Sequence, residues 1–296
     1  MNTTRYLGEK AVKPIGFGAM QLAGPNVFGP PPDPEAARAV LRRAVDLGVD
    51  HIDTSQYYGP DVVNELIRAA LHPYPEDLKL VTKVGGRRDG SGNWLPALSP
   101  PELRQGVEDN LRTLGVERMD LVNLRLFDEH DRDGHLPEQL GVLDELRQEG
   151  KLDLIGVSNA ATDAVVRALE LSEIACVQNA FSVVNRSGED VLSLCEERGL
   201  AFVPFFPLGS AFINGPKHLA EDPTITEIAE RLDATPSQIA LSWLLHRSER
   251  ILLIPGTRSL PHLEENVAAG DIRLGEHDMQ RLESARQIGD PLAGDH

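Results

Sequence analysis

The sequence contains little cysteine and few aromatic residues. Only 2 of its 296 residues are cysteine, and 5% are aromatic. Cys176 lies in a strand-like run and Cys195 in a helix-like run, so we expect two reduced, buried thiols rather than a disulfide framework. No group of residues has the spacing of zinc ligands, and we therefore expect no metal site.

An excess of positive charge is also absent. The chain has 29 Lys and Arg residues against 46 Asp and Glu residues, which gives a formal net charge of -17. This balance argues against the broad basic surface of nucleic-acid-binding proteins, and an anionic membrane would repel it. The first ten residues do not resemble a signal peptide, and no stretch approaches the ~20 apolar residues of a membrane span. We expect a cytoplasmic protein that acts on a small molecule; no feature indicates an oligomeric state.

The chain alternates between two kinds of segment. Short β-rich runs begin near residues 14, 50, 79, 120, 153, 175, 201 and 251, and amphipathic helical patterns lie between them. Alternating strands and helices predict parallel βαβ units. Eight such runs favour a closed (β/α)8 TIM barrel over an open sheet, as a single domain spanning residues 1–296. Residues 5–20 have the pattern of a short hairpin at the bottom of this barrel.

Capping signals mark where several helices begin. Asp33-Pro34-Glu35 has the order of an N-cap, a first-turn proline and an acidic first turn. Ser99 with Glu102, and Thr235 with Gln238, have the spacing of capping boxes. The segments 21–33, 85–98 and 126–137 are long connections that follow strands. They belong on the carboxyl-terminal face, where barrel enzymes carry their active sites.

Polar residues collect where the predicted strands end. Asp53, Lys83 and Arg125 each close an apolar run, as do the pairs Ser158-Asn159 and Gln178-Asn179. Because strand ends converge on one mouth in a barrel, we predict a catalytic site there. The alternative is a buried ion pair without chemistry. His51 precedes Asp53 by two residues, and we interpret it as a core histidine bonded to the backbone.

An ordered set of motifs resembles the aldo-keto reductase family. Asp53-Thr-Ser-Gln-Tyr-Tyr-Gly59 is similar to its Asp-Thr-Ala-x-x-Tyr-Gly signature, and Thr82-Lys83 resembles its strand-three lysine. The later matches are Asp120–Arg125, Gly156–Asn159, Gln178-Asn179, Phe206–Gly209, Ile254–Arg258 and Leu263–Asn266. The resemblance covers residues 5 to 285 and implies reduction of a carbonyl by a nicotinamide cofactor.

The resemblance assigns chemical roles to three residues. Tyr58 is implied as the proton donor, because a carbonyl that accepts a hydride needs a proton at its oxygen. A free tyrosine has a pKa of ~10, and we expect the cation of Lys83 to lower that pKa. Asp53 is then expected to pair with Lys83 and orient it. Tyr57 is the alternative donor, but the family's tyrosine directly precedes the glycine.

Arg125 departs from the family pattern, which has histidine at this place. Arginine also donates hydrogen bonds, and its fork can hold two acceptors, but it does not deprotonate. We expect Arg125 to orient the substrate carbonyl or an adjacent oxygen and to lower the pKa of Tyr58 further. The alternative is an ion pair with Asp128 or Glu129.

The cofactor motif of a Rossmann domain, Gly-x-Gly-x-x-Gly after a strand, is missing. The resemblance instead implies that Ser158, Asn159 and Gln178 hold the nicotinamide carboxamide and that Phe206 stacks on its ring. It places the remaining cofactor contacts at Pro207, Leu208, Ser210, Pro255, Gly256, Thr257, Arg258, Glu265 and Asn266. Arg258 suits a 2′-phosphate, which favours NADP(H) over NAD.

The sequence gives fewer indications of the substrate than of the reaction. Gln21, Phe28, Trp94 and Phe127 lie on the long connections, and their rings suit a flat substrate. Several stretches resemble a bacterial branch of the family that includes pyridoxal reductases, so pyridoxal is the leading substrate. Two other classes stay open: a nicotinamide-binding, redox-sensing module with little turnover, and a lyase in which Lys83 forms a Schiff base.

Overall fold

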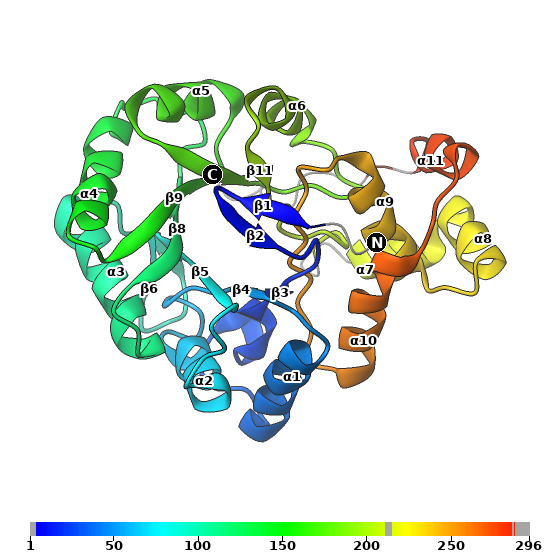
Figure 1. Ribbon diagram of the computed structural model, residues 1–296, viewed down its shortest axis with the longest axis horizontal. Coiled ribbons are helices and arrows are strands. Elements are labelled where there is room, and N and C mark those ends of the chain that lie inside the picture. Colours follow the sequence, from blue (N-terminus) through cyan, green and yellow to red (C-terminus); the bar gives the residue numbers. More distant parts are fainter. Residues whose placement is uncertain (1–3, 211–214, 286, 288–296) are drawn as a thin grey trace.

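The computed structural model describes residues 4–210, 215–285 and 287. The chain begins with an antiparallel hairpin of β1 (Arg5–Leu7) and β2 (Lys10–Val12), in which Tyr6 pairs with Ala11. The hairpin lies across the curved sheet in Figure 1, coloured blue. Leu7 and Val12 pack into the same apolar cluster as Val81 and Leu121 of the sheet strands. The predicted N-terminal hairpin is therefore confirmed.

A seven-stranded parallel sheet forms the centre of the molecule. Its strands, in spatial order, are β3 (Phe17–Gly18), β4 (His51–Asp53), β5 (Lys79–Val84), β8 (Met119–Arg125), β9 (Leu152–Ser158), β10 (Ile174–Gln178) and β11 (Ala201–Phe202). The eighth predicted run forms no regular strand. It makes isolated parallel bridges, between Ile251 and Phe202 on one edge and between Leu253 and Ile15 on the other. Pro14 and Pro255 flank these bridges and lack the N–H groups that would extend the ladder.

Helices alternate with the strands and surround the sheet (Figure 1). They are α1 (Pro34–Asp46), α2 (Val62–Leu71), α3 (Pro100–Leu114), α4 (Leu136–Gln148), α5 (Thr162–Leu171), α6 (Glu189–Arg198), α7 (Gly215–Glu221), α8 (Pro223–Arg231), α9 (Pro236–Arg247), α10 (Leu260–Ala268) and α11 (Glu276–Leu282). Short 3-10 turns occur at η1 (Ala19–Leu22), η2 (Pro25–Val27) and η4 (Ala269–Asp271). Across the described ranges, no helix is both long and apolar enough to cross a membrane.

The predicted helix starts are confirmed by their hydrogen bonds. Asp33 accepts from the backbone N–H groups of the first turn of α1, at 3.0 and 3.1 Å. Ser99 donates its backbone N–H to the carboxylate of Glu102 at 3.2 Å. Thr235 and Gln238 exchange the two bonds of a capping box, at 3.0 and 3.2 Å. These caps set the residue at which each helix begins. They therefore also limit the length of the connection between that helix and the strand before it.

One strand-following connection holds a structure that the sequence pattern did not predict. Residues 86–96 form a second antiparallel hairpin, of β6 (Gly86–Arg88) and β7 (Trp94–Pro96). Its strands are short and lack the alternation of apolar and polar residues that marks a half-buried strand. The hairpin leaves the sheet two residues after β5 ends, beside the predicted catalytic lysine.

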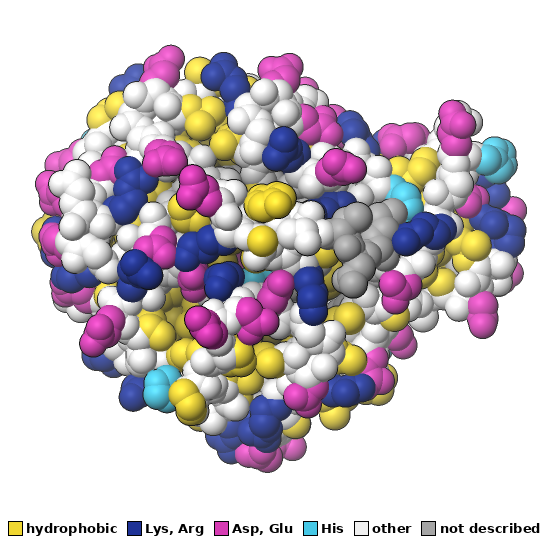
Figure 2. All heavy atoms as spheres, viewed as in Figure 1, with side chains coloured by type: hydrophobic (Ala, Val, Ile, Leu, Met, Phe, Trp, Pro, Cys, Tyr) yellow, Lys and Arg dark blue, Asp and Glu magenta, His cyan; other side chains and the backbone are white. Residues whose placement is uncertain are grey.

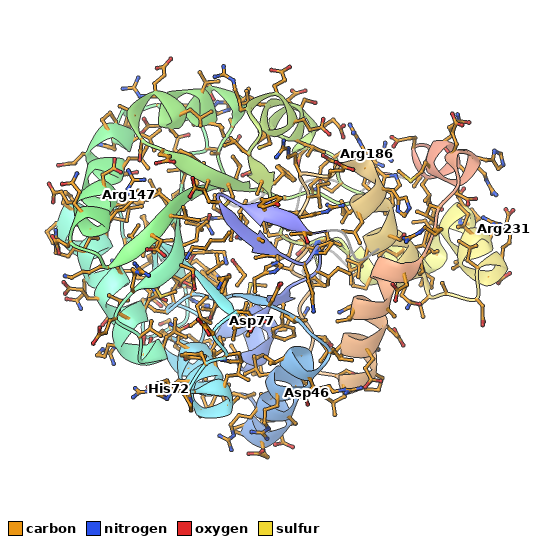
Figure 3. The ribbon with its side chains drawn as sticks, in the orientation of Figure 1. Asp46, His72, Asp77, Arg147, Arg186 and Arg231 are labelled. Carbon is orange, nitrogen blue, oxygen red and sulfur yellow. The ribbon has the colours of Figure 1, made fainter. Side chains whose placement is uncertain are left out.

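Charged side chains dominate the outer surface. Figure 3 shows Arg147 on α4 and Arg231 on α8 at the rim of the molecule. Arg147 forms an ion pair of 2.7 Å with Asp144, one turn away on the same helix. On the hairpin face, which Figure 2 shows, basic and acidic side chains are interspersed. There, Lys10 of the hairpin binds Asp120 and Asp153 at 2.6 and 2.7 Å, and thereby ties the hairpin to the sheet.

Candidate active site

Asp53 and Lys83 form a buried ion pair at the carboxyl ends of β4 and β5. Parallel pairing of β4 with β5 places Asp53 opposite Val81, two residues before Lys83. The Lys83 ammonium binds Oδ1 of Asp53 and lies 3.3 Å from the carbonyl oxygen of Thr54. The two side chains are 6% and 5% exposed, so water does little to screen the pair.

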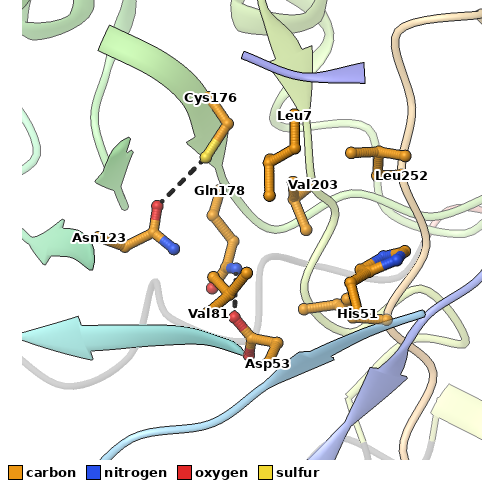
Figure 4. Close-up of a pocket in the computed structure, with 10 residues that line it drawn as sticks. Leu7, His51, Asp53, Val81, Asn123, Cys176, Gln178, Val203 and Leu252 are labelled. Atoms are coloured by element: carbon orange, nitrogen blue, oxygen red, sulfur yellow. Dashed lines mark hydrogen bonds between the residues drawn. The ribbon is translucent and has the colours of Figure 1, made fainter. Parts of the chain in front are cut away.

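Gln178 holds the other oxygen of the same carboxylate. Its Nε2 donates to Oδ2 of Asp53 at 2.9 Å, as Figure 4 shows. The carboxylate is thus bound on both oxygens, by residues from β5 and β10. The Oε1 atom of Gln178 is buried and makes no hydrogen bond within the described part of the chain. A buried acceptor without a partner suits an amide donor such as the nicotinamide carboxamide.

Tyr58 and Tyr57 lie next to this pair and are both buried. The Lys83 ammonium is 5.2 Å from the ring centroid of Tyr58, and the two tyrosine rings meet edge to face at 5.4 Å. Burial raises the pKa of Tyr58 well above its ordinary value, the Asp53 carboxylate raises it further, and Arg125 opposes both. Burial likewise raises the pKa of Tyr57. The predicted net lowering of the Tyr58 pKa is therefore wrong, because desolvation dominates; the lowering predicted from Arg125 is present but smaller than the effect of burial.

Arg125 stands at the end of β8, opposite Ser158 at the end of β9. Its Nη1 donates to Oγ of Ser158 at 3.3 Å, and its guanidinium lies 4.9 Å from the ring centroid of Phe205. The carboxylates offered as alternative partners lie near other side chains: Asp128 is 3.1 Å from Arg132, and Glu129 is 3.6 Å from His130. Phe205 was not among the predicted residues; its neighbour Phe206 was.

The amides predicted to hold the nicotinamide lie together at the ends of β9 and β10. Asn159 has a positive φ of 57° and donates its side chain to the carbonyl oxygen of Leu126 at 3.0 Å. Its backbone N–H donates to the carbonyl oxygen of Gln178, also at 3.0 Å. The expected three residues are thus brought together at the adjacent ends of β9 and β10: Ser158, Asn159 and Gln178.

A tight turn follows β11 and holds four predicted residues. Phe206 has a positive φ of 56°, and its carbonyl oxygen accepts from the N–H of Gly209 at 2.8 Å. Pro207 and Leu208 form the centre of this turn. Ser210 comes directly after it and is buried. The Phe206 and Phe205 rings meet edge to face at 5.2 Å, so the turn stands beside Arg125.

The last predicted cofactor residues gather where α10 begins. Thr257 accepts from the N–H of Ser259 at 3.0 Å, and Arg258 is exposed beside them. Gly256 packs tightly on the first sheet strand: a Cβ there would lie 2.4 Å from the carbonyl oxygen of Gly18. Pro255, Glu265 and Asn266 belong to the same loop and helix, and Asn266 is buried. A loop followed by a helix N-terminus is a natural seat for a phosphate.

The four predicted pocket residues do not form one wall. Phe28 and Trp94 come together around Arg88, whose guanidinium is 5.4 Å from the first ring centroid and 3.9 Å from the second. Gln21 is exposed and lies beside Gly256, nearer the cofactor loop. Phe127 is half-buried, two residues after Arg125. Arg88 was expected only as local positive charge near the substrate loops, and its contacts with these two rings were not predicted, because they depend on the folding of two separate loops.

A small pocket adjoins the site on the inner side of the curved sheet (Figure 4). Apolar side chains of the hairpin and strands line it, together with His51, Asp53, Asn123, Cys176 and Gln178. His51 is buried as predicted, but its Nδ1 lies 3.2 Å from Asp50 rather than on backbone. Both cysteines are free and buried, as predicted, and burial raises the pKa of Cys195 to about 12.

Comparison with known proteins agrees with this geometry. A sequence model of the Aldo/keto reductase family matches residues 14–287. The pyridoxine 4-dehydrogenase of Escherichia coli is 48% identical over 285 residues, covering 95% of this chain and 98% of that protein. An uncharacterized oxidoreductase of Schizosaccharomyces pombe is 39% identical and covers 95% and 89%.

Solved structures give the same result. A thermostable aldo-keto reductase bound to the inhibitor epalrestat has a TM-score of 0.81 at 28% identity, over 96% of this chain and 99% of that one. A Klebsiella pneumoniae aldo/keto reductase with bound NADP and acetate has a TM-score of 0.79 at 25% identity, over 98% of both chains. The resemblance found in the sequence motifs is confirmed: this chain belongs to the aldo/keto reductase family, and is an oxidoreductase.

Proposed function

We propose that this protein reduces the aldehyde of pyridoxal with NADPH, in an active site of Asp53, Tyr58, Lys83 and Arg125. In the net reaction, pyridoxal, NADPH and a proton become pyridoxine and NADP+. The observation that carries the proposal is the buried Asp53–Lys83 pair beside Tyr58. The choice of substrate rests on the 48% identity to a pyridoxine 4-dehydrogenase.

The proposal includes a closed (β/α)8 barrel as one domain. Support comes from the backbone bonds of residues 252 and 253. Leu252 donates to Phe202 at 2.9 Å, and Leu253 donates to Pro14 at 2.8 Å. Residues 250–254 would therefore act as the eighth strand and join the two edges of the seven-stranded sheet.

Tyr58 would act as the proton donor. When bound, NADPH supplies the hydride. The raised pKa keeps the Tyr58 hydroxyl protonated at neutral pH, so a proton is available when negative charge develops on the carbonyl oxygen. Arg125, which lowers this pKa, would then stabilise the phenolate that remains, while the Lys83 ammonium lies 5.2 Å from the Tyr58 ring centroid. Asp53 would act as a positioning residue, holding the Lys83 ammonium in place.

Arg125 would select the substrate. Pyridoxal carries a phenolic oxygen on the ring carbon next to the one that bears the aldehyde. The planar fork of an arginine matches two neighbouring oxygens better than a single imidazole N–H does. Arg125 would therefore hold the aldehyde oxygen and the adjacent phenolic oxygen together, while Phe205 lies against its guanidinium.

NADP(H) would bind across the same face of the barrel. Ser158, Asn159 and the unpartnered Oε1 of Gln178 suit the carboxamide. Phe206 would lie against the nicotinamide ring, and Arg258 and the start of α10 would bind the 2′-phosphate. The same cofactor occupies the related Klebsiella structure.

The experiment is NADPH oxidation by the purified protein with a panel of aldehydes. We expect pyridoxal to be reduced, and 2-hydroxybenzaldehyde to exceed 4-hydroxybenzaldehyde in kcat/KM about tenfold, because only the former offers Arg125 two adjacent oxygens. Arg125→Lys should abolish this preference. Equal rates for the two aldehydes would contradict the role of Arg125. Tight NADPH binding without turnover on any carbonyl would support the redox-sensing alternative.

A further inference from the structure

Arg88 joins two loops that are distant in the sequence. Its guanidinium donates to the carbonyl oxygens of Val27 at 2.8 Å and Asn26 at 3.0 Å, both in the η2 turn. The same group donates to the carbonyl oxygen of Gly92, at the tip of the β6–β7 hairpin, from Nη2 at 2.6 Å and from Nε at 3.0 Å. The Nε, Nη1 and Nη2 atoms of one side chain therefore all donate hydrogen bonds, and together they link the hairpin to the turn.

The flat faces of the same guanidinium are in contact with aromatic rings. Trp94 is paired with Arg88 across the hairpin, and its ring centroid is 3.9 Å from the guanidinium carbon. The Phe28 ring centroid, just beyond η2, is 5.4 Å away. A lysine ammonium can also lie over a ring, but only the planar guanidinium can stack on ring faces while its edge donates hydrogen bonds.

The η2 turn has a backbone conformation that needs support. Asn26 and Val27 have positive φ angles of 56° and 58°. For a β-branched residue such as Val27 this conformation is rare and costs free energy. The carbonyl oxygens of both residues accept from Arg88, so the arginine stabilises the strained turn directly.

Both ends of this arrangement reach the tyrosines of the site. The carbonyl oxygen of Val27 also accepts from the N–H of Gly59, which directly follows Tyr58, at 3.2 Å. On the hairpin side, the Trp94 ring meets the Tyr57 ring edge to face at 5.8 Å. A shift of the hairpin would therefore displace the ring that contacts Tyr57, and a shift of the η2 turn would displace the hydrogen-bond partner of Gly59.

We propose that Arg88 is a positioning residue that clamps the β6–β7 hairpin to the η2 turn and so fixes the outer wall of the substrate pocket for flat aromatic aldehydes. The part that concerns substrate rests on the function proposed above. Trp94 is 43% exposed, while its contacts with Arg88 and Tyr57 limit its freedom.

The clamp can be tested without any substrate. The chain has 2 tryptophans, and Trp243 is fully buried, so fluorescence that acrylamide quenches reports on Trp94. We expect Arg88→Ala, and also Arg88→Lys, to raise the quenching constant about twofold, because Trp94 loses the planar cation on its face. Arg87→Ala is the matched control, since Arg87 is the exposed neighbour that lies 3.7 Å from Glu102.

Activity and chemical rescue complete the test. Arg88→Ala should lower kcat/KM for 2-hydroxybenzaldehyde about tenfold, mainly through KM, and that for a short aliphatic aldehyde much less. Millimolar guanidinium should restore both fluorescence and KM, which it would not do for a protein that is merely less stable.

Unchanged quenching in Arg88→Ala, or an equal effect of Arg87→Ala, would overturn the clamp. Altered quenching with an unchanged aromatic KM would overturn its substrate role. If the wild-type protein reduces no aldehyde, the proposed function fails, while the quenching still tests the clamp.

Discussion

Gln178 donates a hydrogen bond to Asp53 over 2.9 Å, although the two residues are 125 positions apart in the chain. They belong to β10 and β4, which are not neighbours in the sheet, so the bond spans the inner side of the curved sheet. The carboxylate that pairs with Lys83 is thereby fixed on both oxygens. Its geometry depends on three strands rather than on one local motif.

The Asp53–Lys83 pair should matter for stability as well as for activity. Removing one partner leaves the other as a buried, unpaired charge, so we expect Asp53→Asn and Lys83→Met each to lower the free energy of unfolding by about 3–5 kcal/mol. The double variant should lose clearly less than the sum of the two, because no unpaired charge remains. Urea unfolding without cofactor measures all three.

The exposed pair of Arg43 and Glu264, which are 2.7 Å apart, is the control. Glu264→Gln should cost less than about 1 kcal/mol, because water screens an exposed pair. Additive losses at Asp53 and Lys83 would show that the two residues act independently.

The pH dependence of reduction should reflect the raised pKa of Tyr58. Since the protonated hydroxyl is needed, activity should be complete below this pKa and lost only above it, beyond the ordinary tyrosine value of ~10. Arg125 lowers this pKa, so Arg125→Met should move the alkaline limb of kcat/KM to still higher pH. Arg132→Met, on an exposed arginine of the following loop, should leave the limb in place. A limb near neutral pH, or a shift to lower pH in Arg125→Met, would show that this account of the tyrosine is wrong.

The strand ends were predictable because each polar residue directly follows an apolar run. Asp53 and Lys83 are 30 positions apart, yet the register of β4 and β5 brings them together as the pattern indicated. The sign of the Tyr58 pKa shift was not predictable, because a motif does not reveal how far burial outweighs a nearby cation. The Arg88 contacts were hidden for a different reason: they depend on a turn with positive φ angles at Asn26 and Val27, and a β-branched residue such as Val27 rarely adopts this conformation.

The choice between the two nicotinamide cofactors should depend on Arg258. We expect Arg258→Ala to weaken NADPH binding about tenfold or more and to leave NADH binding unchanged, because only NADPH carries the 2′-phosphate. Calorimetric titration of both cofactors measures this difference. Arg273→Ala, which removes another exposed arginine, should change neither affinity. An equal loss for NADPH and NADH in Arg258→Ala would mean that this arginine does not read the phosphate.

The most direct test of the central claim compares two adjacent tyrosines. Tyr57 and Tyr58 are both buried, and the Lys83 ammonium lies 5.2 Å from the ring centroid of Tyr58. Single-turnover reduction of pyridoxal, with NADPH already bound, should slow about 100-fold or more in Tyr58→Phe, because the proton donor is lost. Tyr57→Phe should keep most of the rate, and both variants should bind NADPH as the wild-type protein does. If Tyr58→Phe turns over normally, or if Tyr57→Phe is the variant that fails, Tyr58 is not the proton donor.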